Sequence, residues 1–128
     1  MKPRFYVIIP RDVPQLVPGK LAAQCCHAQS MMCEKLGNSP LYKEWSSGYG
    51  FGTVITLYSG KSMKETVESF DHGGIEQMFV VEDPTYPMKN ERGDSYTIAM
   101  ITCFGLLVDL ENPSYSNILD EIGTYKLY

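Results

Sequence analysis

The hydrophobic residues of this chain fall into short, nearly continuous runs separated by segments of helical spacing. Phe5 to Ile9 is an unbroken apolar run of residue types that favour strands, and Pro10 ends it. A run without polar alternation is typical of a strand that is buried on both faces. Three further runs predict three more strands, at residues 53–58, 77–82 and 97–104.

Between the first two strands the apolar residues recur with the period of an α-helix. Segment 19–36 has this pattern, and Gly37 after it is a suitable terminator. The stripe that we expect to be buried comprises Leu21, Cys25, Ala28, Met32 and Leu36.

Three shorter helices are predicted from their first residues. Ser39-Pro40 opens one that runs to Trp45, as an N-cap followed by proline at the first helical position. Ser62 and Glu65 have the spacing of a capping box, and Gly73-Gly74 would end the helix that they begin. That helix is expected to turn Met63, Val67 and Phe70 inward. Asn112-Pro113 opens the last helix and Gly123 stops it, with an inward face of Tyr115, Ile118, Leu119 and Ile122.

These elements predict a single α/β domain over residues 1–128. Their order is β-α-α-β-α-β-β-α, which favours a three-layer domain with a four-stranded mixed sheet and helices on both faces. Residues 83–96, between the last two strands, hold two prolines, one glycine and several charges. We expect this segment to be a long irregular loop.

Composition narrows the class of protein. Of the 128 residues, 44% are hydrophobic and 20% are charged, which is ordinary for a globular chain. No apolar stretch is long enough to span a membrane, and the N-terminus lacks the features of a signal peptide, so a cytoplasmic location is expected. The net charge of −4 gives no overall basic field, so a nucleic-acid partner would need a local basic patch.

The four cysteines do not have the arrangement of a disulfide framework. Cys25, Cys26 and Cys33 lie in one predicted helix, and Cys103 lies in a strand. We expect them to be reduced and to act as small core residues.

Lys20, Gln24 and His27 are the first candidates for chemistry. Their i, i+4, i+7 spacing places them on one face of the predicted helix, with Lys20 in its first turn. A helix N-terminus with an added positive charge suits an anion or a developing oxyanion. The alternative is that Lys20 is a solvated charge and His27 a partly buried residue with satisfied hydrogen bonds.

Asp83 and Thr97 are the second pair of candidates. Asp83 follows the third predicted strand and Thr97 begins the fourth, so pairing of these strands would bring them to the same edge of the sheet. The alternative for Asp83 is an Asx-turn with Pro84.

Other patterns do not support a site. Cys25, Cys26 and His27 are consecutive and point about 100° apart on a helix, so they form neither a metal site nor a nucleophile–base pair. Gly60-Lys61-Ser62 is similar to the end of a phosphate loop, but Ile55 stands where the earlier glycine is required.

Two segments together resemble a known family. Gly19-Lys20-x-x-Ala23-Gln24-x-x-His27-Ala28 resembles the Gly-Lys-x-x-Ala-Gln-x-x-His-Ala signature of the Pth2-type peptidyl-tRNA hydrolases. Arg11 upstream and Glu44-Trp45 downstream also fit. The closing residues Gly123-Thr124-Tyr125-Lys126-Leu127-Tyr128 are similar to the family's final Gly-His-Leu-Lys-Leu-aliphatic.

The resemblance implies a four-stranded mixed sheet flanked by helices, commonly in a homodimer. The implied activity is hydrolysis of the ester joining a peptide to the 3′ end of tRNA, with no metal or organic cofactor. Position by position, Lys20, Asp83 and Thr97 match the family's active-site lysine, aspartate and threonine. In the mechanism that this implies, Lys20 and the helix N-terminus would stabilise the oxyanion, while Asp83 and Thr97 would orient the attacking water. The alternative role for Lys20 is to hold the phosphate of the terminal adenosine.

The segment after Asp83 departs from the family's usual Ala-Gly-basic-Thr-Gln. Thr85, Lys89 and Arg92 are the expected substitutes there, and with Gln24, His27 and Arg11 they are expected to bind the substrate. Two alternatives remain open. One is a non-catalytic module of the same fold that binds tRNA or a protein, and the other is a hydrolase of a different small acyl ester or amide.

Overall fold

A five-stranded mixed sheet forms the centre of the computed structural model, which describes residues 1–70 and 78–128. The sheet has the strand order β3-β4-β1-β2-β5. β1 and β2 run parallel, and the other neighbouring pairs are antiparallel. The strands are β1 (Pro3–Ile9), β2 (Val54–Tyr58), β3 (Met78–Lys89), β4 (Ser95–Asp109) and β5 (Lys126–Leu127).

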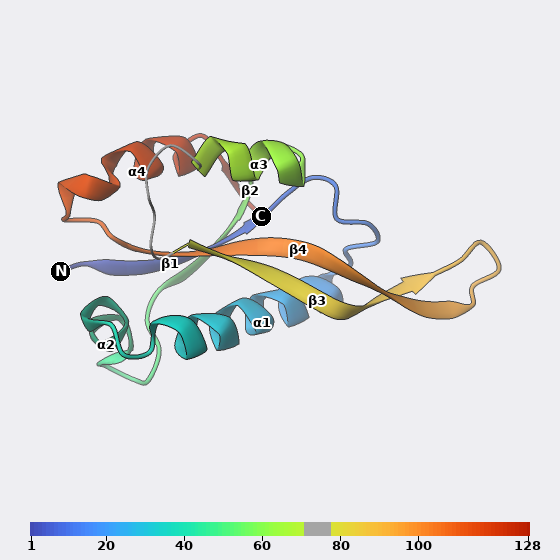
Figure 1. Cartoon of the computed structure of the whole chain (residues 1–128), viewed down its shortest axis with the longest axis horizontal. Coiled ribbons are helices and arrows are strands. Elements are labelled where there is room, and N and C mark those ends of the chain that lie inside the picture. Colours follow the sequence, from blue (N-terminus) through green and yellow to red (C-terminus); the bar gives the residue numbers. More distant parts are fainter. Residues whose placement is uncertain (71–77) are drawn as a thin grey trace.

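Helices cover both faces of this sheet, as the sequence predicts (Figure 1). α1 (Pro18–Leu36) and α2 (Pro40–Ser46) lie on one face. On the other face lie α3 (Met63–Phe70) and α4 (Ser116–Ile122), the latter preceded by a 3-10 turn at Pro113–Tyr115. A hydrophobic core fills the space on each side of the sheet. The chain is therefore a single three-layer α/β domain.

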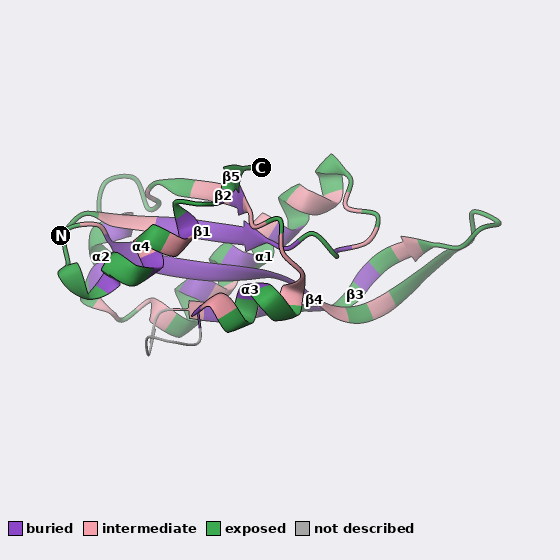
Figure 2. Cartoon of the chain, turned by 90° about the horizontal axis from the view of Figure 1, so that it is seen from above, coloured by how far each residue is buried: buried purple, intermediate pink, exposed green. Residues whose placement is uncertain are grey.

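β1 is buried on both faces, which explains its unbroken apolar run. Phe5, Val7 and Ile9 contribute to the core under α1 and α2, whereas Tyr6 and Ile8 contribute to the core under α3 and α4. The purple colour of β1 and of the C-terminal half of β4 in Figure 2 marks this doubly covered centre.

The prediction of four strands is wrong, because the chain adds β5 to the free edge of β2. Leu127 pairs with Leu57 and Lys126 pairs with Tyr58. A strand of only two residues has no detectable period in the sequence, so the pattern could not predict it.

The prediction of an irregular loop at 83–96 is also wrong. β3 and β4 continue through it as a hairpin that projects from the body of the domain, with a turn at residues 90–94 (Figures 1 and 2). Gly93 has a positive φ of 83° in this turn. Pro84 and Pro87 are compatible with β3 because it is an edge strand, where a missing N–H need not interrupt the ladder.

The helix boundaries follow the predicted caps closely, with one error in the inward face of α3. Ser39 accepts from the amide of Tyr42, and Ser62 accepts from the amide of Glu65. Val67 is 36% exposed, and the fully buried Thr66 takes the inward position instead, where its hydroxyl bonds back to the Ser62 carbonyl at 2.7 Å. The predicted helix end at Gly73-Gly74 and the strand start at 77 lie outside the described residues.

All four cysteines are free, as expected, but only part of the expected core role is confirmed. Cys103 is buried and Cys25 is partly buried, whereas Cys26 and Cys33 are exposed on α1. Across residues 1–70 and 78–128, no helix combines the length and the apolar character needed to cross a bilayer.

Candidate functional site

A buried polar cluster joins α1 to β3 and β4. Gln24 of α1 is only 2% exposed, and its amide nitrogen donates to Oδ2 of Asp83 over 2.8 Å. Its amide oxygen accepts from the hydroxyl of Thr102 over 2.6 Å. One glutamine side chain therefore fixes two strands relative to the helix. Lys20, Gln24 and His27 all reach residues of β3, so the prediction that they share one face of the helix is confirmed.

A bulge in β4 brings Thr102 into this cluster. Val81 pairs with Cys103 and Glu82 with Ile101, so Thr102 is the extra residue on its strand. Thr102 and Cys103 consequently both face α1, where the thiol of Cys103 approaches the Gln24 carbonyl at 3.9 Å. Burial raises the pKa of the Cys103 thiol to about 12, so this cysteine is not a nucleophile.

Asp83 is held in its ionised form although it is buried, with only 6% of its surface exposed to solvent. It lies within β3, next to a second register shift, rather than at the end of the strand as predicted. Its Oδ1 accepts from the Thr85 amide at 2.9 Å, which is the Asx-turn considered as an alternative. Burial alone would raise the pKa of Asp83, but hydrogen bonds from Gln24 and Thr85, together with nearby His27, hold it below its ordinary value.

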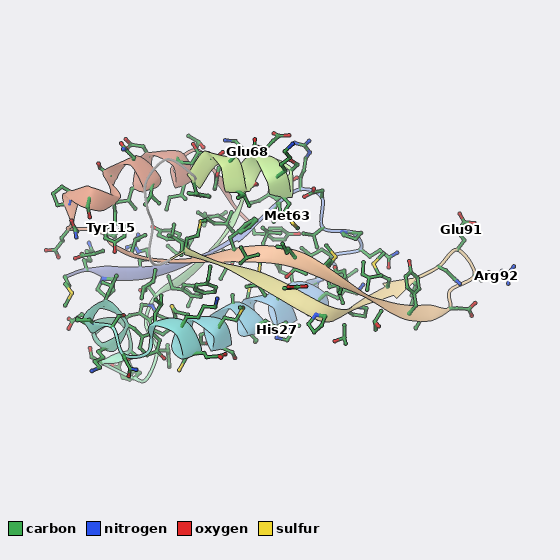
Figure 3. The ribbon with its side chains drawn as sticks, in the orientation of Figure 1. His27, Met63, Glu68, Glu91, Arg92 and Tyr115 are labelled. Atoms are coloured by element: carbon green, nitrogen blue, oxygen red, sulfur yellow. The ribbon has the colours of Figure 1, made fainter. Side chains whose placement is uncertain are left out.

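His27 lies at the rim of the cluster. Its Nε2 is 3.8 Å from Oδ2 of Asp83, and about half of its side chain (51%) is exposed. Figure 3 shows the His27 side chain leaving α1 towards β3. The polar network therefore opens to solvent at His27, one turn along α1 from Gln24.

Lys20 is held against the hairpin. Its Nζ donates to the carbonyl oxygen of Pro87 and lies 4.9 Å from the centre of the Tyr86 ring. Tyr86 is fully buried and donates its hydroxyl to the Pro14 carbonyl over 2.7 Å. α1 begins here without a side-chain cap and without an acid in its first turn. The ammonium group of Lys20 is therefore held in place next to the uncapped N-terminus of α1.

A hollow of about 430 Å³ lies beside Lys20, between the start of α1 and the hairpin. Its apolar walls include Val17, Pro87 and Met88. Gln15 closes one side, because its amide both donates to the Lys89 carbonyl and accepts from the Lys89 amide, each at 3.0 Å. Gln15 adopts a positive φ of 52° in making this clamp.

Several predicted site residues are not brought together with Asp83. Thr97 pairs with Pro87, and since its neighbour Ile98 packs in the core under α1, strand alternation turns Thr97 to the opposite face of the sheet. Thr97 and Asp83 therefore lie in the same pair of strands at one edge of the sheet, but their side chains point to opposite faces. Arg92 projects at the tip of the hairpin, at the far end from His27 (Figure 3). Arg11 lies 3.6 Å from Glu65 and donates to the Gly60 carbonyl.

The sequence reasoning missed three residues that the site contains: Thr102, Tyr86 and Gln15. A polar residue within the apolar run 97–104 was the available signal for Thr102, since a hydroxyl buried in a strand needs a partner. In the part of the chain that the structure describes, no group of three histidine, cysteine or acidic side chains could hold a metal.

Comparison with known proteins identifies the family. No curated protein matches the chain. A family model, described as Peptidyl-tRNA hydrolase PTH2, matches residues 4–105. The match covers most of the chain and includes Lys20, Gln24, Asp83 and Thr102. The chain therefore belongs to the PTH2 family of peptidyl-tRNA hydrolases.

Proposed function

We propose that this protein hydrolyses the ester bond between a peptide, or an N-blocked amino acid, and the 3′ end of tRNA. Membership of the family supports this reaction class. The observation that carries the proposal is Asp83, a buried carboxylate kept ionised by Gln24 and Thr85 within a cluster that opens to solvent at His27. The substrate occurs where translation takes place, so we assign the activity to the cytoplasm.

Asp83 is the proposed base that orients and activates the attacking water. A carboxylate has about four acceptor sites, of which the Gln24 amide and the amide and hydroxyl of Thr85 use three. A water bound at a remaining site would face the solvent side, next to His27. As the water attacks the ester carbonyl, its proton passes to Asp83 and the carbonyl oxygen gains negative charge. When the tetrahedral intermediate collapses, the bond between the acyl carbon and the ribose 3′ oxygen breaks, and the proton held by Asp83 passes to that leaving oxygen.

Lys20 and the start of α1 are the proposed stabilisers of that oxyanion. Lys20 lies one helical turn before Gln24, and Gln24 binds the Asp83 carboxylate of β3. The Lys20 ammonium group and the Asp83 carboxylate therefore lie along the same part of the contact between α1 and β3. The Pro87 carbonyl and the Tyr86 ring keep the ammonium group in a defined position before substrate binds. Losing a preorganised contact of this kind typically lowers turnover by about 100- to 1000-fold.

Thr97 has no part in this mechanism, because it lies on the other face of the sheet. Thr102 acts instead as a positioning residue, since it bonds to Gln24 and thereby fixes the donor to Asp83. Lys89 and Arg92 on the hairpin, with Arg11, are proposed to contact RNA phosphates, and Arg92 would do so at a distance from the ester.

The test is release of the N-acetyl-aminoacyl group from N-acetyl-aminoacyl-tRNA by the purified protein. Lys20→Met should lower kcat by about 100-fold or more, because it removes a charge acting on the transition state. Lys35→Met is the matched control, since Lys35 is an exposed lysine in the last turn of the same helix.

Equal activity of the two variants would remove Lys20 from the mechanism. A folded parent without any turnover would contradict the hydrolase proposal and favour the non-catalytic binding module.

A further inference from the structure

A second hollow, of about 460 Å³, is bordered by the same loop that separates β1 from α1. Pro10, directly after β1, and Tyr58, the last residue of β2, form part of its wall. It therefore lies at the carboxyl ends of the two parallel strands. This is the position where open α/β sheets generally bind ligands.

Two tyrosines give this hollow an aromatic wall. The rings of Tyr58 and Tyr128 meet edge to face, with their centres 6.0 Å apart and their planes at 80°. Tyr128 is 51% exposed, so one face of its ring remains available. A fixed, half-exposed aromatic ring is a common platform for an unpaired nucleobase.

Two basic residues line the same hollow. Lys126 is exposed and forms no ion pair within the described residues. Arg11 is 50% exposed and lies 3.6 Å from Glu65, which leaves part of its guanidinium group accessible. Because the chain as a whole has a net charge of −4, RNA would need a local basic patch to bind. The two basic residues and the two tyrosines that line this hollow form such a patch.

Tyr86 connects this hollow to the candidate active site. Its hydroxyl bonds to Pro14 in the shared loop. The two hollows share this loop, because Val13 and Leu16 line the second hollow whereas Gln15 and Val17 line the hollow beside Lys20.

We propose that this hollow binds the last unpaired nucleotide of the RNA 3′ end, with its base stacked on Tyr128 and its phosphate facing Lys126 and Arg11. The proposal rests on the proposed hydrolase function and assigns the RNA half of the substrate to this hollow. The apolar hollow beside Lys20 is then left for the acyl half.

The experiment measures binding of the RNA trinucleotide cytidine-cytidine-adenosine, the sequence of the tRNA 3′ end, to the intact protein. Tyr128→Ala should weaken binding by about 5- to 150-fold, as expected for loss of one stacking platform. Tyr49→Ala is the matched control, because Tyr49 is 87% exposed and lies outside the hollow. If the parent does not bind the trinucleotide, or if Tyr128→Ala binds it as well as Tyr49→Ala does, the proposal is overturned.

The salt dependence of trinucleotide binding tests whether Lys126 contacts a phosphate. Lys126→Gln should reduce the slope of log K against log salt concentration by about 0.7, the value for one phosphate contact on single-stranded RNA. Lys64→Gln, a change at an exposed lysine of α3, should leave the slope unaltered. An unchanged slope in Lys126→Gln would overturn the assignment of the phosphate.

Failure of this inference can be told apart from failure of the hydrolase proposal. A parent that hydrolyses N-acetyl-aminoacyl-tRNA but binds the trinucleotide independently of Tyr128 overturns the subsite and leaves the reaction standing. A parent that binds through Tyr128 without hydrolysis overturns the reaction and supports the subsite.

Discussion

Replacing Gln24 with leucine should destabilise the fold by an amount that the structure allows us to work out. The change removes the hydrogen bond to the Asp83 carboxylate, and bonds to charged groups are worth about 1.5–3 kcal/mol. It also leaves the Thr102 hydroxyl without its acceptor, at about 1 kcal/mol. Burial of the more apolar leucine side chain offsets about 1 kcal/mol of this loss of stability. The expected net loss of unfolding free energy is about 1.5–3 kcal/mol.

Urea denaturation at pH 7 measures this loss directly. Gln24→Leu should lower the midpoint while leaving the m-value unchanged, because the folded core keeps its extent. Gln29→Leu is the control, since it makes the same chemical change at an exposed position of the same helix. In addition, the pKa of Asp83, followed by NMR titration of its carboxyl group, should rise in Gln24→Leu because a donor to the ionised form is lost.

A difference between the two variants below about 0.5 kcal/mol would refute the reasoning, since that is the usual range of surface substitutions. An unchanged pKa of Asp83 would refute it independently. It would mean that the Gln24 amide does not stabilise the carboxylate.

Three further perturbations test other parts of the structure. Because the folded-state pKa of Asp83 is lowered, its charge stabilises the fold fully above about pH 4, and this contribution is lost as the pH falls through the folded value. The difference in unfolding free energy between the parent and Asp83→Asn, measured by urea denaturation, should therefore become smaller from pH 7 to pH 3. A difference that does not change with pH would contradict this role of the Asp83 charge. Gly105→Ala should cost about 1–3 kcal/mol in thermal unfolding, since its new Cβ would overlap the buried ring of Phe79, and a neutral change would show that the ring can move freely. Gln15→Ala should cost about 1 kcal/mol and speed amide exchange at Lys89, whereas unchanged exchange would argue against the clamp.

Much of the fold could be predicted from the sequence because its strongest signals are local. The apolar run at Phe5–Ile9, the helical period of α1 and the serine caps of α2 and α3 all depend on neighbouring residues, and all are found in the structure. The hairpin was missed because its two prolines and its charges are typical of loops. Only its place at the edge of the sheet makes them compatible with a strand, and edge position is a property of the whole fold.

The candidate site could be predicted only in part, for a similar reason. Lys20 and Asp83 were found through a motif and a strand end, but their partners depend on contacts between distant parts of the chain. Gln24 is 78 residues from Thr102, and a bulge in β4 decides that Thr102, rather than Thr97, faces α1. A one-residue change of register reverses which face a side chain occupies, and a sequence pattern does not specify the position of a bulge.

The central claim is that Asp83 activates water for ester hydrolysis. The most direct test is the single-turnover rate of N-acetyl-aminoacyl-tRNA hydrolysis by Asp83→Asn, which keeps the shape of the side chain and removes its charge. Asp120→Asn, at an exposed position of α4, is the control. We predict that Asp83→Asn lowers the rate by about 100-fold or more while Asp120→Asn retains it, in line with the loss of a general base. A rate for Asp83→Asn within a few-fold of both the parent and Asp120→Asn would contradict the claim.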